Sequence, residues 1–324
     1  MESKKISVII PARNEENEIG RAMDSVLKTN YEDLEIVVVN DGSTDKTAEI
    51  VESYMKKHRN IILVNFKEGH SAAFARNRGA EKANGETLVF FDADTVMNTS
   101  FLKEINKKRD KADAYIVICF PLKTTFVSKV LSGMIGKPFK LGLQDGSIYS
   151  KKNCNDAGKM FFSISKKAYE KIGGYGEDTF YFEDEAFADK FYLAGFNSVL
   201  VKNAIQYFEL PSDFGGFVRQ CNWLGRGINT IKNSSARRNK KLIWLLKGLF
   251  LAFPLFFLYE PRLLSAFLLL TLGTTYISTT WRNKKPLLSL MTTIFVYLKT
   301  FFVIFYFLFH SIKGDTLNKK KNKN

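Results

Sequence analysis

The stretch LVFFDADT, residues 88–95, runs four apolar residues into two acids that a single residue separates. A short apolar run of this kind fits a buried strand, and Asp92 and Asp94 then lie at its carboxyl end. In open α/β sheets, ligands bind at that edge. Two carboxylates at i and i+2 can both turn toward one hard cation, Mg²⁺ or Mn²⁺, which often shares its oxygen ligands with substrate phosphates. The alternative is a solvated Asp-x-Asp turn that caps the next helix.

The chain before this stretch alternates between strand and helix patterns. Short β-branched or apolar runs predict strands, and apolar residues on one helical face, such as Ile19, Met23 and Val26, predict helices. The predicted strands cover 6–10, 34–39, 61–66 and 88–91, and the predicted helices follow Asn14 and cover 46–57 and 71–83. This alternation predicts an α/β fold with a Rossmann-like, mostly parallel sheet and flanking helices.

Beyond the opening stretch the pattern is less regular. We expect strands at 113–120, 159–165 and 198–201, and helices at 166–172 and 183–194. The residues from 121 to 158 include several Gly and Lys and fit no element. Either an acceptor-binding loop or a surface insertion accounts for them.

Charge is distributed unevenly along the chain. From Arg237 onward, 15 Lys and Arg face Glu260 and Asp315, so this part carries +13 of the total of +15. The part before Arg237 carries +2, which is not the basic balance of a nucleic-acid-binding domain, and no nucleic-acid partner is expected. The three cysteines form no C-x-x-C pair, so neither structural zinc nor a disulfide framework is expected. The N-terminus lacks a signal-peptide pattern, which favours a cytoplasmic first domain.

Three apolar segments follow, at 242–258, 263–280 and 287–309, and Lys and Arg clusters flank them. Spanning a bilayer takes roughly 20 apolar residues, and buried helices of a soluble domain are the alternative. The sequence thus predicts a cytosolic domain over 1–236 and a C-terminal helical membrane region over 237–324, with two to three hydrophobic helices and a basic tail. We expect a multi-pass membrane protein whose catalytic domain faces the cytoplasm and whose basic clusters meet the lipid bilayer.

Three loops should converge at the carboxyl edge of the sheet. Pro11-Ala12-Arg13-Asn14-Glu15 follows the first strand, Asn40-Asp41-Gly42 follows the second, and Asp92-Ala93-Asp94 follows the fourth. Asp41 could accept a hydrogen bond from a nucleobase N–H. Arg76 and Asn77 could also reach the site, Arg76 toward a phosphate.

These motifs resemble the family 2 glycosyltransferases of GT-A fold, which include relatives of dolichyl-phosphate mannose synthase and of polysaccharide synthases. The resemblance covers about residues 5 to 230 and rests on four motifs in order, VIIPARNE at 8–15, VNDGSTD at 39–45, ARNRG at 75–79 and DAD at 92–94. It implies a nucleotide-sugar donor, either a UDP- or a GDP-sugar, together with Mg²⁺ or Mn²⁺ and transfer with inversion at the anomeric carbon. The apolar segments further suggest a lipid-linked acceptor, which is a lipid phosphate, a lipid-linked saccharide or a glycolipid.

Two later segments extend the resemblance. Gly173-Gly174-Tyr175 followed by Phe182-Glu183-Asp184-Glu185 is similar to the acidic acceptor motif, which makes Asp184 the general base. An acidic helix N-terminus is the alternative for these acids. Residues 219–227 resemble the segment after the catalytic motif, in which Arg219 or Arg226 could stabilise the leaving pyrophosphate or instead face lipid head groups. Processive members carry Gln-x-x-Arg-Trp, from which Gln220 and Trp223 depart.

The sequence therefore predicts an inverting glycosyltransferase that uses a membrane-associated acceptor. Its predicted site comprises Asp184 as catalytic base, Asp92 and Asp94 as metal ligands, and Pro11, Ala12, Arg13, Glu15, Asp41, Arg76, Asn77, Asp92, Ala93, Arg219 and Arg226 around the donor. A processive polysaccharide synthase is one alternative. A non-catalytic membrane scaffold that retains a transferase-like domain is another, although Asp41, Asp92, Asp94 and Asp184 are all present.

Overall fold

The computed structural model describes residues 4–123, 125, 128, 144–152, 161–177, 183–229, 273, 276 and 286–313. The chain divides into two units, residues 1–122 with 139–209 and residues 123–138 with 210–324, and each unit is described by itself. The division into 1–236 and 237–324 that the sequence suggested stays a prediction.

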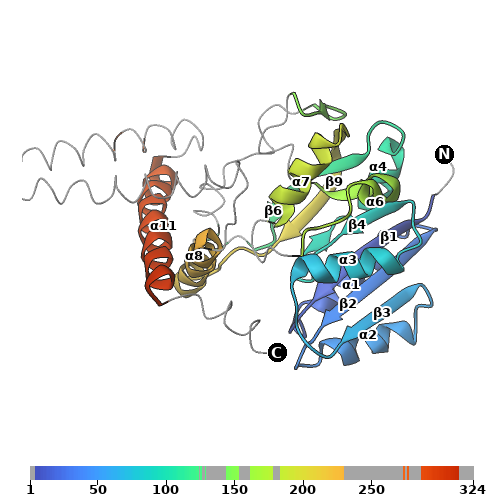
Figure 1. The fold of residues 1–324 in the computed structure, drawn as a ribbon, viewed down its shortest axis with the longest axis horizontal. Coiled ribbons are helices and arrows are strands. Elements are labelled where there is room, and N and C mark those ends of the chain that lie inside the picture. The colour runs from blue at the N-terminus through green and yellow to red at the C-terminus, as the bar shows by residue number, and fades with distance from the viewer. Residues whose placement is uncertain are drawn as a thin grey trace, which may run out of the picture. The chain divides into compact units, whose positions relative to one another are not determined.

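The first unit is built on a mixed sheet with flanking helices (Figure 1). Its strands are β1 (Ile6–Ala12), β2 (Leu34–Asp41), β3 (Ile61–Phe66), β4 (Thr87–Phe90), β5 (Val96–Met97), β6 (Ala114–Pro121), β7 (Ile148–Tyr149), β8 (Phe161–Ser165) and β9 (Ser198–Phe208). Its helices are α1 (Ile19–Leu27), α2 (Thr47–Met55), α3 (Ala72–Lys82), α4 (Phe101–Lys108), α6 (Lys166–Lys171) and α7 (Glu183–Leu193).

Within the described residues the strands form one sheet in the order β3-β2-β1-β4-β8-β6-β9-β5, and β7 pairs with β9. The strands β1 to β4 are parallel, as predicted. β8 is inserted antiparallel between β4 and β6. Because β1, β2 and β4 run in the same direction, the loops that follow them leave from the same edge of the sheet.

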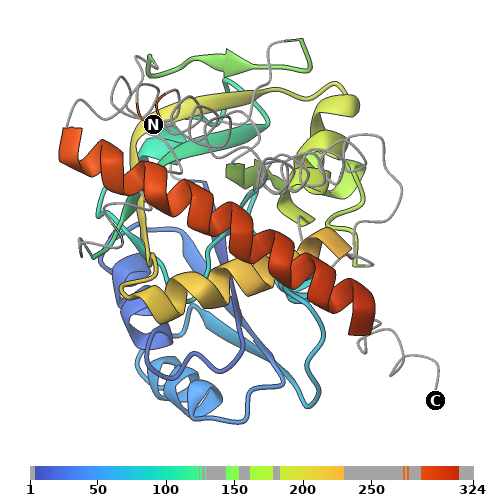
Figure 2. The ribbon, with the colours of Figure 1, turned by 90° about the vertical axis from the view of Figure 1, so that its left-hand side faces the viewer.

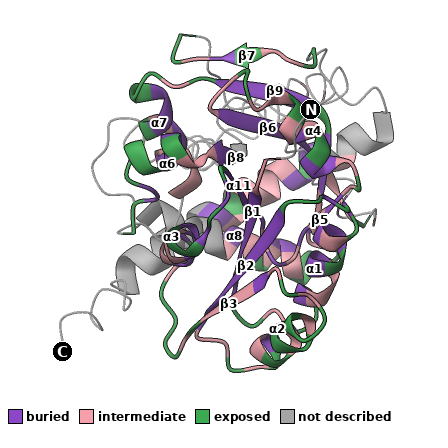
Figure 3. Ribbon diagram, turned by 90° about the vertical axis from the view of Figure 1, so that its right-hand side faces the viewer, coloured by how far each residue is buried: buried purple, intermediate pink, exposed green. Residues whose placement is uncertain are grey.

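Two apolar cores cover opposite faces of the sheet. Along β1, Ile6, Val8 and Ile10 belong to the core that includes residues of α1, α2 and α4, whereas Ile9 belongs to the core with α3, α6 and α7. The central strands β1, β2 and β4 are buried along most of their length, while the helices have exposed outer faces (Figure 3). A parallel strand that is covered on both faces reads as a continuous apolar run, which explains why the sequence predicts these strands well.

The end of the sheet that carries β5 and β9 differs from the prediction. The strand expected over 198–201 continues to Phe208. Lys202 and Asn203 form an exposed bulge between its two paired segments, and this polar interruption is where the predicted strand ended. After the bulge, β9 pairs with the two-residue strand β5, which the sequence analysis did not identify. Most of the unassigned segment 121–158 lies outside the described residues. Its described part contains the short strand β7.

In the second unit, α8 (Phe214–Asn229) packs against α11 (Pro286–Lys313), as Figure 2 shows. The ring of Phe217 in α8 lies 5.1 Å from that of Phe295 and 6.4 Å from that of Phe302 in α11, measured between centroids. Phe217, Phe295 and Val303 are buried. Part of the apolar surface of α11 is therefore used in helix packing.

The expected multi-pass membrane localisation is wrong. In the part of the chain that the structure describes, no helix combines the length and the apolar character that crossing a bilayer requires. The segment 287–309 corresponds to α11, where Lys299 interrupts the apolar run and several aromatic side chains pack on α8. The segments 242–258 and 263–280 lie outside the described residues, apart from positions 273 and 276.

Candidate active site

Hydrogen bonds join the loops after β1 and β2 at the carboxyl edge of the sheet. Asn14 has a left-handed backbone with φ 58°. Its N–H donates to Ser43 Oγ at 2.9 Å, and its Oδ1 accepts from the Thr44 N–H at 2.8 Å. The Glu15 N–H donates to Thr47 Oγ1 at 2.8 Å. The loop Pro11–Glu15, with Pro11 and Ala12 at the end of β1, is therefore fixed beside the loop that follows Asp41.

Asp41 is buried at the end of β2 and is held by His70. Asp41 Oδ2 accepts from the His70 N–H at 2.9 Å, and Oδ1 lies 2.9 Å from His70 Nδ1. The His70 ring stacks on Phe74 of α3 with centroids 4.0 Å apart and meets the edge of Phe66 at the end of β3. An acid at the end of β2 thus faces an aromatic cluster, and the sequence analysis assigned no role to His70.

A glycine brings the segment with His70 close to Asp41. Gly42 has φ +70°, and a Cβ at this position would lie 2.5 Å from the Glu68 carbonyl carbon. On the other side of the segment, the Arg13 guanidinium lies so close to Gly69 that a Cβ there would overlap it. Arg13 and Gly42 therefore enclose the turn that leads into His70.

Arg76 lies between three carboxylates. Its guanidinium comes from α3 with a side chain that is 5% exposed, and it lies 3.0 Å from Asp92, 3.1 Å from Glu183 and 3.3 Å from Asp184. Asp92 follows β4, whereas Glu183 and Asp184 form the first turn of α7. The predicted metal ligand Asp92 and the predicted base Asp184 are thus joined through one cation.

The first turn of α7 holds Asp184 partly out of water. Its side chain as a whole is 41% exposed, but Oδ1 is buried and accepts no hydrogen bond from the described residues. Burial raises the pKa of Asp184, the Arg76 charge opposes this shift, and Glu183 and Asp92 add to it. A carboxylate with a raised pKa is a suitable proton acceptor near neutral pH, and the Arg76 guanidinium 3.3 Å from Oδ1 helps to hold it in place.

Negative charge accumulates around the Asp92-Ala93-Asp94 loop. Burial, followed by the charge of Asp92, raises the pKa of Asp94 to about 6, and Arg21 acts in the opposite direction. Burial, followed by the charge of Asp94, raises the pKa of Glu15 to about 7. Ala93 is buried between the two acids. Burial and mutual repulsion thus both disfavour the charged forms of Asp94 and Glu15.

This carboxylate set fits a divalent cation. Asp92 and Asp94 offer oxygen ligands, and a bound cation would offset the charge that raises the pKa of Asp94. Among the described residues, no group of three or more His, Cys, Asp and Glu side chains is gathered for a metal ion. Two protein carboxylates completed by diphosphate and water oxygens are a usual arrangement for Mg²⁺.

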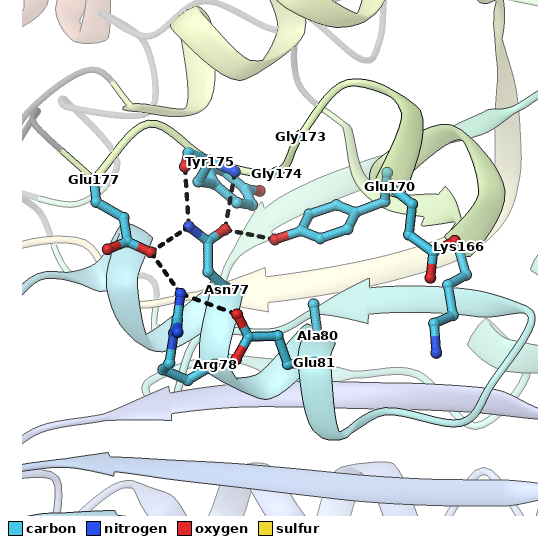
Figure 4. A pocket seen from close by; sticks show the side chains of 11 residues that line it. Asn77, Arg78, Ala80, Glu81, Lys166, Glu170, Gly173, Gly174, Tyr175 and Glu177 are labelled. Carbon is cyan, nitrogen blue, oxygen red and sulfur yellow. Dashed lines mark hydrogen bonds and ion pairs between the residues drawn. The ribbon is translucent and has the colours of Figure 1, made fainter.

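The remaining residues that the sequence placed around the donor are Asn77, Arg219 and Arg226. Asn77 lines a pocket of about 420 Å³ with Arg78, Tyr169 and Tyr175, and its side chain makes hydrogen bonds within the protein (Figure 4). Arg219 belongs to the second unit, and the side chain of Arg226 lies outside the described residues. Their approach to the donor therefore stays a prediction.

With this geometry in place, the chain can be compared with known proteins. The family model described as Glycosyl transferase family 2 matches residues 7–173, which is more than half of the chain. The chain belongs to glycosyltransferase family 2. The matched residues include the ends of β1, β2 and β4, Arg76 and Gly173.

Two relatives in this family illustrate its range. The chain is 27% identical to the poly-beta-1,6-N-acetyl-D-glucosamine synthase of Staphylococcus epidermidis, over 73% of this chain and 58% of that protein. It is 29% identical to the GalNAc(5)-diNAcBac-PP-undecaprenol beta-1,3-glucosyltransferase of Campylobacter jejuni, over 54% of this chain and 55% of that protein. The chain spans from 16% to 58% of the length of the curated relatives it matches.

A solved structure supports the GT-A fold. The mannosyltransferase of Pyrobaculum calidifontis, in complex with GDP-Man and Mn2+, aligns with a TM-score of 0.58 at 18% identity, over 95% of this chain and 88% of that one. The first unit therefore has the α/β fold, a mixed sheet with flanking helices, that the sequence predicted.

The contacts of His70, Tyr175 and Arg21 were not foreseen. Arg21 donates to the Asp94 carbonyl at 3.4 Å and pairs with Glu209 at 3.0 Å, which ties α1 to the acidic loop. These partners come from elements far apart in the sequence. The Gly-Gly that precedes Tyr175 was linked to the acids of residues 183–185 by the resemblance alone, and nothing in the pattern connected the histidine after Gly69 to Asp41.

Proposed function

We propose that the chain is an inverting glycosyltransferase that moves a hexose from a UDP- or GDP-sugar onto a hydroxyl of a lipid-linked saccharide. The observation that carries this proposal is the bridge from Asp92 through Arg76 to Asp184. It joins a carboxylate suited to a cation–diphosphate complex with one suited to take up a proton. An inverting transfer needs both, on opposite sides of the anomeric carbon.

Asp92 and Asp94 would hold Mg²⁺ or Mn²⁺ against the donor diphosphate. When bound, the cation offsets the negative charge that develops on the leaving nucleotide. Arg76 supplies a fixed positive charge beside Asp92 and keeps that carboxylate in place. Arg219 or Arg226 would add a further positive charge toward the diphosphate.

Asp184 would act as the base. It accepts the proton of the acceptor hydroxyl while the hydroxyl oxygen forms a bond to the anomeric carbon and the bond from that carbon to the diphosphate oxygen breaks. The raised pKa of Asp184 strengthens its affinity for this proton. Because the oxygen enters opposite the leaving group, the configuration at the anomeric carbon inverts.

The nucleoside would bind at the ends of β1 and β2. Each oxygen of the Asp41 carboxylate has two acceptor positions, so Asp41 can keep His70 and still accept from a nucleobase N–H. Arg13 and the backbone from Pro11 to Glu15 form the neighbouring wall. The stacked rings of His70 and Phe74 offer an apolar surface beside it.

The glucosyltransferase relative, whose name specifies an undecaprenol-linked substrate, favours a lipid-linked saccharide as acceptor. A processive synthase is the second candidate, because the relative from Staphylococcus epidermidis aligns over 73% of this chain. The departure of the segment Gln220–Leu224 from Gln-x-x-Arg-Trp favours a single transfer.

The test begins with the thermal unfolding of the purified chain in the presence of UDP-, GDP- and dTDP-sugars with Mn²⁺. A ligand that binds the folded state raises its melting temperature. With the donor identified in this way, Asp184→Asn should lower kcat by about 10²- to 10⁴-fold while donor affinity is retained. If no nucleotide sugar binds or is turned over, the proposed function is wrong.

A further inference from the structure

The side chain of Asn77 uses all of its hydrogen-bonding positions within the protein (Figure 4). Its Oδ1 accepts from the Tyr169 hydroxyl at 2.6 Å and from the Tyr175 N–H at 2.9 Å. Its Nδ2 donates to the Tyr175 carbonyl at 3.0 Å and to Glu177 Oε1 at 2.8 Å. An amide side chain has two acceptor and two donor positions, so none remains for a nucleotide. Asn77 instead holds both backbone polar groups of Tyr175.

The backbone before Tyr175 is shaped for this contact. Gly173 and Gly174 have φ +70° and +62°, a left-handed conformation that glycine adopts without strain. A Cβ on Gly174 would lie 2.8 Å from Asn77 Oδ1 and 2.9 Å from the Tyr169 hydroxyl. The paired glycines therefore let the chain turn tightly enough to reach the amide of Asn77.

The ring of Tyr175 lies among the elements that carry the charged site. It stacks on Phe187 with centroids 4.0 Å apart and planes inclined by 10°. It meets Phe90 edge-on at 5.2 Å, and the Arg76 guanidinium carbon lies 5.3 Å from its centroid. Phe187 follows Asp184 by about one turn of α7. Phe90 precedes Asp92 by two residues in the chain.

We propose that Asn77 is a positioning residue for Asp184 and Arg76, acting through Tyr175, and that it does not contact the donor. Asn77 fixes the backbone of Tyr175, and the ring of Tyr175 supports both the first turns of α7 and the Arg76 guanidinium. Loss of this support moves Asp184 relative to the acceptor hydroxyl. The inference rests on the proposed function of the site, and it changes the role that the sequence suggested for Asn77.

Asn77→Asp tests the proposal with little change of shape. The variant keeps the two acceptor contacts of Oδ1 but replaces both donated hydrogen bonds with repulsion toward the Tyr175 carbonyl and Glu177. We expect kcat to fall by about 10²-fold, which is the effect of a misplacement of roughly 1 Å. The Kd for the nucleotide sugar with Mn²⁺, measured by titration calorimetry, should stay within about twofold, because no donor contact is lost.

The double variant N77D/E177Q provides a rescue. A glutamine at position 177 can donate to the new carboxylate, and the net charge of the pair returns to that of the original pair. We expect kcat to recover by about tenfold over N77D alone, since one of the two lost hydrogen bonds is restored. Glu81→Gln is the matched control, because Glu81 pairs with Arg78 on the same helix and, in the described part of the chain, makes no hydrogen bond with Asn77 or Tyr175.

Two results would overturn the inference. One is a Kd for the donor that weakens tenfold or more in N77D with kcat at saturating donor unchanged. The other is an unchanged kcat in a variant that has only a lowered melting temperature, because a purely structural residue behaves in that way. Glu177→Ala, which removes the outer hydrogen bond of Asn77 together with the ion pair between Glu177 and Arg78, gives a smaller fall in kcat and carries the test if N77D does not fold. If the wild-type chain binds no nucleotide sugar, the proposed function is wrong. If the wild-type chain is active and N77D has the same kcat, only this inference is wrong.

Discussion

Arg76 is the residue that balances the charge of the site. Three carboxylates from two elements lie within 3.3 Å of its guanidinium. A buried guanidinium with a planar fork of donors can serve several acids at once, whereas an ammonium group is a single point charge. The geometry of the site therefore depends on the guanidinium shape as well as on its charge.

Arg76→Lys should lower kcat/KM by about 10²- to 10³-fold, because a donated hydrogen bond to Asp92 or Glu183, or the ion pair with Asp184, is lost. The charge is kept, so folding should survive, as circular dichroism can establish. Arg59→Lys, in the turn between α2 and β3, is the control and should behave like the wild-type chain. A kcat/KM for R76K within twofold of wild type would contradict this reading of the site.

The acidic loop should make cation binding depend on pH. Asp94 and Glu15 have pKa values raised to about 6 and about 7, so each takes up a proton as the pH falls through those values. Protons then compete with the cation, and the affinity for Mn²⁺ should weaken by about tenfold per pH unit below 6. Calorimetric titration with Mn²⁺ and a fixed concentration of nucleotide sugar at pH 5, 6, 7 and 8 measures this slope.

Asp94 and Glu15 also determine how the stability of the folded chain changes with pH. Their pKa values in the folded chain lie above the ordinary values, so the folded state binds protons more tightly and loses stability as the pH rises from about 4.5 to 7. A bound cation removes that penalty. Mn²⁺ should therefore raise the melting temperature more at pH 8 than at pH 5, and an equal rise at both values would contradict the assignment of these acids to the cation site.

At the scale of elements, the chemistry depends on loops pressed against each other at the strand ends. Gly42 and Gly195 form a natural comparison, because both have left-handed φ values, +70° and +87°. A Cβ at position 42 would lie 2.5 Å from the backbone of Glu68, whereas one at position 195 would meet nothing within 4 Å. The difference isolates the loop contact from the backbone strain that both positions share.

Gly42→Ala should therefore destabilise the chain by more than Gly195→Ala, which is expected to cost about 1 kcal/mol for the left-handed conformation alone. G42A should also weaken donor binding, because it separates the segment with His70 from Asp41, while G195A should leave donor affinity unchanged. Urea unfolding and donor titration on both variants make the comparison. Equal losses of stability with equal donor affinities would show that the contact with Glu68 is unimportant.

The sequence predicted some elements better than others for physical reasons. β1, β2 and β4 are buried on both faces, so their apolar runs are continuous and easily recognised. β5 has only two residues, and a polar bulge at Lys202 interrupts β9, so the sequence predicted neither β5 nor the part of β9 that follows the bulge. The antiparallel direction of β8 depends on pairing with β4 and β6, which local residues do not encode.

The same limit applies to the site residues. The acids of the DAD motif and Asp184 could be proposed from the sequence, because their types and order resemble those of a family. The bridge through Arg76 could not, since Glu183 lies 107 residues from it in the chain. Arg76 and Asn77 were placed at the site together, yet successive residues of a helix point about 100° apart, and the side chain of Asn77 binds Tyr175 instead.

At the scale of the whole molecule, the membrane expectation failed because an apolar segment has more than one use. Phe295 and Val303 in α11 are buried, and Phe295 packs on α8. Hydropathy alone does not distinguish a residue that faces lipid from one that faces another helix. Activity is therefore best tested with an acceptor supplied in detergent, which makes no assumption about the location of the chain.

The number of sugars in the reaction product distinguishes the two candidate functions, single transfer and processive synthesis. An inverting enzyme with one base should convert an α-linked nucleotide sugar into a β-linked product, because the acceptor oxygen enters opposite the diphosphate. A single transfer should add one sugar to each acceptor even with excess donor, and mass spectrometry of the product measures this number. The anomeric coupling constant in the NMR spectrum of the product gives its configuration. A ladder of longer products would favour the processive synthase, since that activity requires the product to stay bound between additions. An α-linked product would remove the role of Asp184 as an inverting base, and Asp184→Asn would then lose its predicted effect on kcat.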